Sequence, residues 1–287
     1  MEININTKFI TLIGTPLNQS FAAKMQNAGY QAAGLDLVYF YSEADQTGLP
    51  HVLEGVRSMP FAGCAVTKPN KVEVMKYLDG YDPLCEKMGS SNTVVKTPEG
   101  KLIGYNTDGY GALRSLEEHA GSLKGRTVIS FGAGGTGRSV CFELANAGVE
   151  RLYICSRSAA CEELSEQLNA FYPGVCVPVR ASDTEKLSAA MKETSIVLNL
   201  SGAGMRGKED TTCVDKALLS AGQICFDATY NPEETRFLRE AREIGCKTIN
   251  GLDMSLYQGA RQIELWTGKE APVEAMRKTL LDIVSNK

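Results

Sequence analysis

The sequence predicts an α/β protein made of two units, an N-terminal α/β unit with a mixed sheet and a second unit with a doubly wound parallel sheet. Short apolar runs of strand length alternate along the chain with longer segments of helical periodicity. In mid-chain, Gly132, Gly134 and Gly137 have G-x-G-x-x-G spacing between an expected strand and an expected helix. We expect residues 1–107 with 252–287 to form the first unit and residues 108–251 to form the second.

Composition excludes several functional classes. The 287 residues, 43% of them hydrophobic, suffice for one large domain or two ordinary ones. A net charge of -4 disfavours broad binding to nucleic acid or anionic membranes, which requires a basic face. No segment approaches the roughly 18 consecutive apolar residues of a membrane helix, and the N-terminus lacks a signal-peptide pattern. We expect a cytoplasmic monomer or homodimer without nucleic-acid or membrane partners.

The nine cysteines are odd in number, and no Cys-x-x-Cys pair occurs among them. Several lie in apolar runs, so we expect buried, reduced thiols rather than a disulfide framework. The two histidines, His51 and His119, are too few for a histidine-rich metal site. We therefore expect no metal and assign both histidines to the surface or to packing.

Hydrophobic patterning defines the elements of the first hundred residues. The apolar run 9–14 is closed by Gly-Thr-Pro, which indicates a strand and a turn. The run 37–41 is rich in Val, Tyr and Phe, residue types favoured in strands. The remaining expected strands are 63–67, 93–96 and 101–105, and the expected helices are 20–33, 52–57 and 71–78.

From residue 108 the pattern changes to regular alternation. A helix is expected over 108–119, followed by a polar, glycine-containing turn over 121–125. Strands then alternate with helices, which is typical of a doubly wound sheet. The expected strands are 127–131, 151–155, 176–179, 196–200, 224–229 and 247–250, the expected helices are 136–147, 161–171 and 233–244, and two C-terminal helices, 254–266 and 272–284, are expected to pack back on the first unit.

The glycine loop has the context of a Rossmann-type dinucleotide site. Gly132 permits the tight turn, Gly134 lets the backbone approach a pyrophosphate, and the helix N-terminus offers free N–H groups. A glycine-rich turn without a ligand is the alternative. The next strand ends in Ser156-Arg157-Ser158, without the carboxylate that binds the ribose of NAD. Arg157 could pair with a 2′-phosphate, which favours NADP and leaves NAD possible; a solvated surface arginine is the alternative.

Two charged residues suggest a proton-handling site. Lys71 follows a strand and a proline-containing turn, which places it near the carboxyl edge of the first sheet. Asp108 stands where the chain leaves the first unit, and we expect it at a cleft between the units. A lysine beside a carboxylate can hold an alcohol or ketone and exchange its proton. Together with the dinucleotide loop, this pair suggests a carbonyl/alcohol oxidoreductase.

These segments resemble the shikimate/quinate dehydrogenase family over essentially the whole chain. The family signature Asn-Val-Thr-x-Pro-x-Lys is similar to residues 65–71, and Asn-Thr-Asp-Gly-x-Gly is complete at 106–111. Further matching blocks are 92–93, 132–135 with Arg138, 199–205, 227–232 with Thr235, 251–254, 257–260 and 266–268.

The resemblance implies hydride transfer between a nicotinamide and the C3 carbonyl carbon of a ring carboxylic acid. Lys71 and Asp108 would be the catalytic pair. The resemblance places Ser20, Thr67, Asn92, Tyr230 and Gln258 at the substrate; Gly132, Ala133, Gly134 and Gly135 at the pyrophosphate; Ser156, Arg157 and Ser158 at the adenosine ribose; and Met205 and Gly251 at the nicotinamide.

Departures from the family pattern concern the substrate carboxylate. The family motif Ser-x-Ser-Pro, whose serines hold that group, retains Ser20 but has Ala22 and Ala23 in place of the second serine and the proline. The asparagine of the lysine motif is Ala65. The main expectation is interconversion of 3-dehydroshikimate and shikimate. The alternatives are quinate or another hydroxy ring acid as substrate, and a non-catalytic NADPH-sensing protein.

Overall fold

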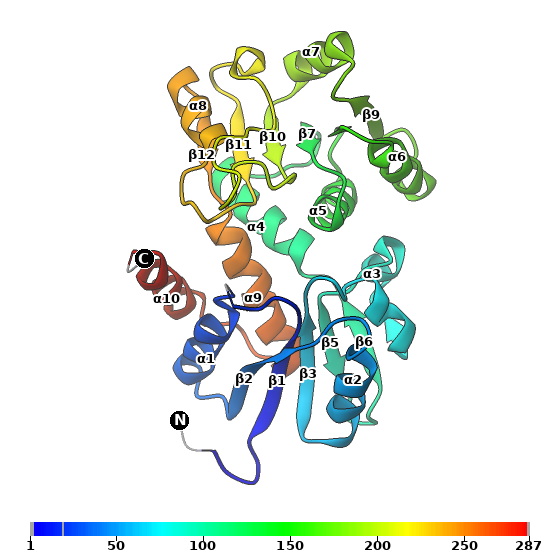
Figure 1. Cartoon of the computed structure of the whole chain (residues 1–287), viewed down its shortest axis with the longest axis vertical. Coiled ribbons are helices and arrows are strands. Elements are labelled where there is room, and N and C mark those ends of the chain that lie inside the picture. Colours follow the sequence, from blue (N-terminus) through cyan, green and yellow to red (C-terminus); the bar gives the residue numbers. More distant parts are fainter. Residues whose placement is uncertain (1–2, 19, 286–287) are drawn as a thin grey trace. The chain divides into compact units, whose positions relative to one another are not determined.

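The computed structural model describes residues 3–18 and 20–285. Contacts within the chain define two compact units: unit 1 comprises Met1–Gly111 with Leu256–Lys287, and unit 2 comprises Ala112–Ser255. Both boundaries fall inside helices, α4 (Asp108–Ala120) and α9 (Leu252–Thr267), which are labelled in Figure 1. Asp108 therefore groups with unit 1.

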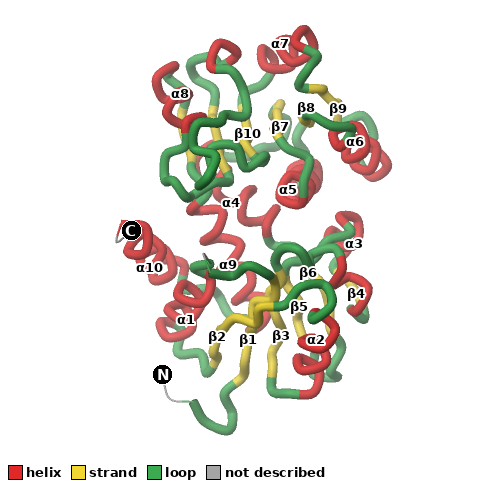
Figure 2. The backbone as a smooth tube through the Cα atoms, in the orientation of Figure 1, coloured by secondary structure: helices red, strands yellow, loops and turns green. Residues whose placement is uncertain are grey.

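The described strands of unit 1 form a mixed sheet with the order β2-β1-β3-β5-β6-β4 (Figure 2). β1 is parallel to β2 and β3, whereas β5 is antiparallel to β3 and β6. The carboxyl ends of β1, β2, β3 and β6 and the start of β5 consequently share one edge. The strands are β1 (Lys8–Gly14), β2 (Leu37–Glu43), β3 (Phe61–Val66), β4 (Gly80–Tyr81), β5 (Thr93–Lys96) and β6 (Leu102–Tyr105).

Helices bury their apolar faces against this sheet. Leu53 of α2 lies in one core cluster with Val94 of β5. Trp266 Nε1 in α9 donates to the Val94 carbonyl at 2.9 Å. A Cβ on Gly29 of α1 would lie 3.0 Å from Met276 of α10, so these helices approach closely. This packing confirms that the C-terminal helices return to unit 1, whose other helices are α1 (Ala22–Ala32), α2 (Leu49–Ser58), α3 (Pro83–Met88) and α10 (Val273–Ser285).

Unit 2 contains a parallel sheet with the order β12-β11-β10-β7-β8-β9. Counted from β7 as the first strand, this is the Rossmann order 3-2-1-4-5-6, which reverses between β7 and β10. The expected fold class is confirmed. The elements are β7 (Thr127–Phe131), α5 (Gly135–Asn146), β8 (Arg151–Ser156), α6 (Ala160–Phe171), β9 (Cys176–Arg180), α7 (Thr184–Glu193), β10 (Ile196–Asn199), η2 (Lys216–Leu218), β11 (Ile224–Asp227), α8 (Arg236–Ile244) and β12 (Lys247–Ile249).

The α-helix expected over 71–78 was wrong. The segment forms a turn and a short 3₁₀ helix, η1 (Glu73–Tyr77). The Lys71 carbonyl accepts a hydrogen bond from Ser91 N at 2.8 Å, so it is engaged outside the helix. A tertiary hydrogen bond thus overrides the helical periodicity.

Sequence reasoning also missed α3 and α7, although both carry capping signals. Asp82 accepts from Leu84 N at 3.1 Å, Pro83 begins α3, and Gly89 ends it with a φ of 62°. Asp183 accepts from Lys186 N at 3.0 Å at the start of α7. Both helices were identifiable from their caps rather than from their apolar periodicity.

All nine cysteines are free; eight are buried, as expected, and Cys213 is half-buried. Burial raises the pKa of Cys64 and of Cys141 to about 12. Along residues 3–18 and 20–285, no helix is both long and apolar enough to cross a membrane.

Candidate active site

Three segments of unit 1 converge at the shared edge of its sheet. Lys71 follows β3, Asn92 immediately precedes β5, and Asp108 follows β6. Thr93 pairs with Ala65 in β3 and with Tyr105 in β6, so the antiparallel register brings these chain ends together. The sheet topology therefore explains how residues up to 37 positions apart form one site.

Lys71 and Asp108 form a direct ion pair. Lys71 Nζ donates to Asp108 Oδ2 at 2.5 Å, with 23% and 12% of the respective side chains exposed. Asp108 is also the first residue of α4, where the positive end of the helix dipole favours a carboxylate. The pair is thus shielded but open enough for its ammonium to meet a small ligand.

Asn92 links this pair to a third chain segment. Its Nδ2 donates to Asp108 Oδ1 at 2.8 Å and approaches Gln258 Oε1 at 3.3 Å. Its Oδ1 accepts from the Thr107 backbone N–H at 2.8 Å. The structure therefore joins four residues expected at the active site: Lys71, Asn92, Asp108 and Gln258.

Ser20 and Thr67 lie in the loops after β1 and β3. Ser20 Oγ accepts from Ala22 N at 3.3 Å, while its carbonyl accepts from Tyr41 Oη at 2.8 Å. A Cβ on Gly14 would meet Thr67 Cγ2 at 2.4 Å, so glycine is required where these loops touch. Both residues belong to the edge that carries Lys71, although no hydrogen bond described here joins either side chain to the ion pair.

The switch point of the unit 2 sheet opens into a cavity of about 970 Å³. It is lined by the ends of neighbouring strands: Gly132 and Gly134 after β7, Ser156 and Arg157 at and after β8, and Ser201 after β10. Ala133 and Ser158 also line it, as do Lys208, Thr211 and Thr212, which sequence reasoning had not selected. Their position in the chain could have identified them, since they belong to the loop that follows β10, a strand at the switch point.

The glycine loop fits a dinucleotide phosphate. A Cβ on Gly134 or Gly135 would meet no atom within 4 Å, so open space lies beside the backbone where α5 begins. In contrast, a Cβ on Gly137 would lie 2.1 Å from the Gly132 carbonyl oxygen, which shows that this glycine serves the packing of helix on strand.

Ser156 and Arg157 play different parts in the segment 156–158. Ser156 Oγ donates to the Ser158 carbonyl at 2.6 Å and accepts from Cys161 N at 3.1 Å, so it shapes the start of α6. The exposed Arg157 lines the cavity and can supply a cation there. The loop that Ser156 organises thus carries a positively charged side chain at the cavity wall.

Tyr230, Met205 and Gly251 belong to unit 2. Met205 is 42% exposed. A Cβ on Gly251 would lie 2.2 Å from the Ala228 carbonyl oxygen, so a larger residue would displace the backbone. None of these residues lines the dinucleotide cavity as described.

Asp227 holds the nearby loops in place. It accepts from Thr235 Oγ1 at 2.7 Å, Thr229 N at 2.8 Å and Asn199 Nδ2 at 2.9 Å. Burial raises the pKa of the Asp227 carboxyl, and these hydrogen bonds act in the opposite direction. Since Asn199 also donates to the Ala203 carbonyl, the network fixes the loop that contains Met205.

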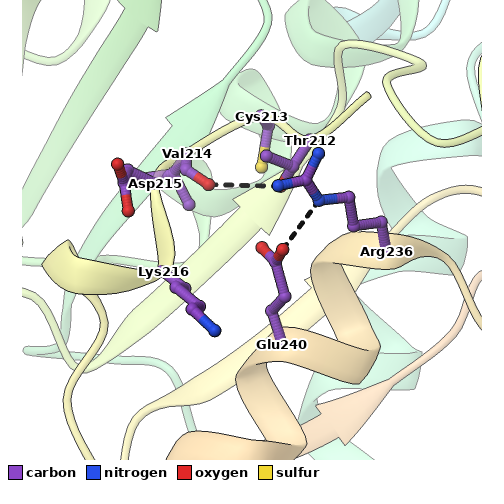
Figure 3. Close-up of a pocket in the computed structure, with 7 residues that line it drawn as sticks. All are labelled: Thr212, Cys213, Val214, Asp215, Lys216, Arg236 and Glu240. Atoms are coloured by element: carbon purple, nitrogen blue, oxygen red, sulfur yellow. Dashed lines mark hydrogen bonds and ion pairs between the residues drawn. The ribbon is translucent and has the colours of Figure 1, made fainter. Parts of the chain in front are cut away.

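A second hollow of about 330 Å³ adjoins the cavity through Thr212 and Cys213 (Figure 3). On its α8 side, Arg236 Nε forms a 2.7 Å ion pair with Glu240, one turn further along the helix. Arg236 also donates to the Asp210 carbonyl at 2.8 Å. The guanidinium of Arg236 is therefore already engaged by groups of the protein itself.

Glu118, His119 and Asp253 bring potential metal-ligand atoms within 4.8 Å of one another. His119 Nε2 lies 3.5 Å from Asp253 Oδ2. However, Lys247 Nζ donates to the His119 carbonyl, and this neighbouring positive charge disfavours a bound cation. The group does not change the expectation of a metal-independent site.

Comparison with known proteins identifies the family. The curated shikimate dehydrogenase (NADP(+)) of Methanocaldococcus jannaschii is 37% identical over 287 residues, covering 99% of each chain. The chain belongs to the shikimate dehydrogenase family. The family model for the shikimate dehydrogenase substrate binding domain matches residues 12–94, and that for the shikimate 5'-dehydrogenase C-terminal domain matches residues 251–281.

Solved structures show the same similarity. Shikimate 5-dehydrogenase from Listeria monocytogenes, in complex with shikimate and NAD, is 36% identical, with a TM-score of 0.93 and 98% coverage of both chains. The ligand-free 5-ketofructose reductase of a Gluconobacter strain is 31% identical, with a TM-score of 0.89, covering 98% of this chain and 100% of the other. The fold of this family therefore occurs in enzymes named for different substrates.

Proposed function

We propose that this protein is an NADP-dependent dehydrogenase that interconverts 3-dehydroshikimate and shikimate. The observation that carries the proposal is the 2.5 Å Lys71–Asp108 pair, joined through Asn92 to Gln258 at the sheet edge of unit 1. The Rossmann order and the glycine-lined cavity of unit 2 support the cofactor. Full-length similarity to enzymes named shikimate dehydrogenase (NADP(+)) supports the substrate.

The proposed roles follow from the groups present. Lys71 Nζ binds the ring oxygen that changes between alcohol and ketone, and its positive charge stabilises negative charge developing there. Asp108 orients that ammonium and, with Lys71, holds or receives the alcohol proton. Asn92, Gln258, Thr67 and Ser20 bind the remaining polar groups of the substrate, and Tyr230 lies close to it.

Backbone N–H groups and a positively charged side chain would bind the dinucleotide. Gly132 to Gly135 present backbone N–H groups at the start of α5 to the pyrophosphate, and Arg157 pairs with the 2′-phosphate. Met205 and Gly251 border the nicotinamide. A bound nicotinamide would supply the hydride-transfer chemistry, for which the side chains of this protein have no equivalent.

A second candidate function differs from the first only in its substrate. Ala22 and Ala65 cannot make the hydrogen bonds of a serine and an asparagine, each worth about 1–3 kcal/mol when a buried group loses its partner. The substrate of this second candidate would be quinate or another hydroxy ring compound, whose carboxylate would be bound by other groups. The similarity to 5-ketofructose reductase shows that such variation occurs within this fold.

Initial rates over a substrate panel test the proposal. Reduced-nicotinamide absorbance is followed with shikimate, quinate and a neutral polyol, each with NADP and with NAD. We expect the highest kcat/KM for shikimate with NADP. A higher value for quinate or the polyol would support the second candidate, whereas tight NADPH binding without turnover of any compound would indicate a cofactor-sensing protein and contradict both.

A further inference from the structure

A file of buried polar side chains runs through unit 1 to Asp108. Gln26 of α1 and Thr93 of β5 are completely buried, and Gln262 of α9 is 3% exposed. Gln26 Nε2 donates to Gln262 Oε1 at 3.1 Å, and Gln262 Nε2 donates to Thr93 Oγ1 at 2.9 Å. Thr93 Oγ1 then donates to Asn92 Oδ1 at 2.8 Å, and Asn92 completes the file at Asp108.

Backbone groups fix the direction of every bond in this file. Asn92 Oδ1 faces the Thr107 backbone N–H, which is a donor, so Asn92 Nδ2 faces Asp108. Gln26 Nε2 faces the Gly259 carbonyl at 3.1 Å, which is an acceptor, so this side chain must present its amide nitrogen to Gln262. The amide assignments are therefore determined by fixed partners at both ends.

Four donors point the same way and end on a carboxylate. Aligned hydrogen bonds polarise one another, and the effect is larger in a buried, low-dielectric setting. Because the last acceptor is a carboxylate oxygen, the aligned donors strengthen this last hydrogen bond and fix the plane of the Asp108 carboxylate. Its second oxygen thereby remains directed at Lys71.

We propose that Thr93, Gln262 and Gln26 are positioning residues that orient the Asp108 carboxylate through Asn92. The proposal rests on the proposed function in one respect: turnover responds only if Asp108 takes part in the reaction. A purely structural role, in which the same bonds tie α1 and α9 to the sheet, would lower stability without acting on Asp108.

Isosteric substitution at Thr93 separates the two roles. Thr93→Val removes the hydroxyl and retains the volume, whereas Thr93→Ser retains the hydroxyl. Thr11→Val is the matched control, because Thr11 is equally buried in the same sheet and donates to Ser42 Oγ at 2.8 Å, outside the file. We expect kcat to fall about 10-fold in Thr93→Val, with KM within about twofold of wild type and recovery in Thr93→Ser. Thr11→Val should lose similar thermal stability and keep kcat.

A second readout needs no substrate. The carboxyl ¹³C signal of Asp108, assigned with Asp108→Asn, is recorded at one fixed pH in protein labelled at aspartate. In the wild-type protein, Asn92 Nδ2 donates to Asp108 Oδ1 and Lys71 Nζ donates to Asp108 Oδ2. We expect Thr93→Val to move this signal by more than its linewidth, because the hydrogen bond that supports Asn92 is lost, and Thr11→Val to leave it at the wild-type position.

Every outcome of these two experiments either supports or overturns the positioning role. An unchanged Asp108 carboxyl signal in Thr93→Val, or a kcat no lower than that of Thr11→Val, overturns the positioning role. If Thr93→Val does not fold, Gln262→Met carries the same comparison with the Thr93 hydroxyl retained. If the wild-type protein turns over no ring compound but the Asp108 signal still moves in Thr93→Val, the proposed function fails and the positioning of Asp108 stands.

Discussion

At the scale of single residues, the proposed chemistry depends on charge placed where a substrate oxygen can reach it. Lys71 Nζ lies 2.5 Å from Asp108 Oδ2, which holds the ammonium at a defined place beside the carboxylate. The sequence could identify both residues as candidates. The hydrogen bonds by which Asn92 links to Asp108, and those by which Thr93 and Gln262 support Asn92, depend on three-dimensional contacts.

Lys71→Met should abolish most of the turnover and leave the cofactor site intact. Loss of the cation that we propose binds and protonates the substrate oxygen should lower kcat by about 10²–10⁴-fold. The Kd for NADPH, measured by fluorescence, should remain within about twofold, since the glycine cavity contains no Lys71 atom. Lys76→Met is the control, because Lys76 is exposed and pairs with Glu73; equal effects of both variants would refute the role of Lys71.

Arg157→Ala should change cofactor preference. A charge-assisted hydrogen bond to a phosphate contributes about 1.5–3 kcal/mol, so KM for NADP should rise about 10–100-fold while KM for NAD stays nearly constant. Arg151, at the opposite end of the same strand, provides the matched control Arg151→Ala. Parallel losses for NADP and NAD would mean that Arg157 does not contact the 2′-phosphate.

At the scale of elements, most strands and helices followed from apolar periodicity, and the errors have local causes. The 71–78 segment failed to form an α-helix because the Lys71 carbonyl bonds to Ser91 N. Helix α3 is short and was concealed by a weak apolar pattern, despite its caps at Asp82 and Gly89. Hydrogen bonds between distant segments cannot be read from periodicity, whereas caps can.

Two glycines of the dinucleotide loop should respond differently to alanine. Gly137→Ala places a Cβ 2.1 Å from the Gly132 carbonyl, so helix and strand must separate and the melting temperature should fall by several degrees. Gly134→Ala meets nothing within 4 Å and should retain the wild-type melting temperature. Calorimetry and NADPH titration measure both effects. We expect Gly134→Ala to weaken NADPH binding at least tenfold, and unchanged binding would place the pyrophosphate elsewhere.

At the scale of the whole molecule, the sequence predicted the two-unit class, the parallel and mixed sheets and the return of the C-terminal helices. It also placed Lys71, Asn92, Asp108 and Gln258 among the expected site residues, which the structure joins by hydrogen bonds. Gln262 was not selected, and Thr93 was noted only as part of the matching block 92–93, because a buried amide or hydroxyl has no distinctive pattern in a single sequence. For Gln262 the available signal was its place on α9 one turn after Gln258, on the same face of the helix.

Burial of the thiols gives a prediction for the intact fold. The pKa of Cys64, Cys85, Cys141, Cys155 and Cys176 is raised to about 12 by burial, so each stays protonated at pH 8. Alkylation of these five in native protein should be about a thousandfold slower than in urea-unfolded protein, since the thiolate is the nucleophile. Mass spectrometry locates the labels, and rapid native labelling of any of the five would contradict their described burial.

Isotope transfer can show whether a hydride leaves C3 of shikimate for the nicotinamide. Wild-type protein is incubated with NADP and shikimate carrying deuterium at C3, and the nicotinamide product is analysed by mass spectrometry. We expect reduced NADP that carries one deuterium, together with 3-dehydroshikimate. Recovery of unlabelled cofactor and unchanged shikimate would contradict this hydride transfer.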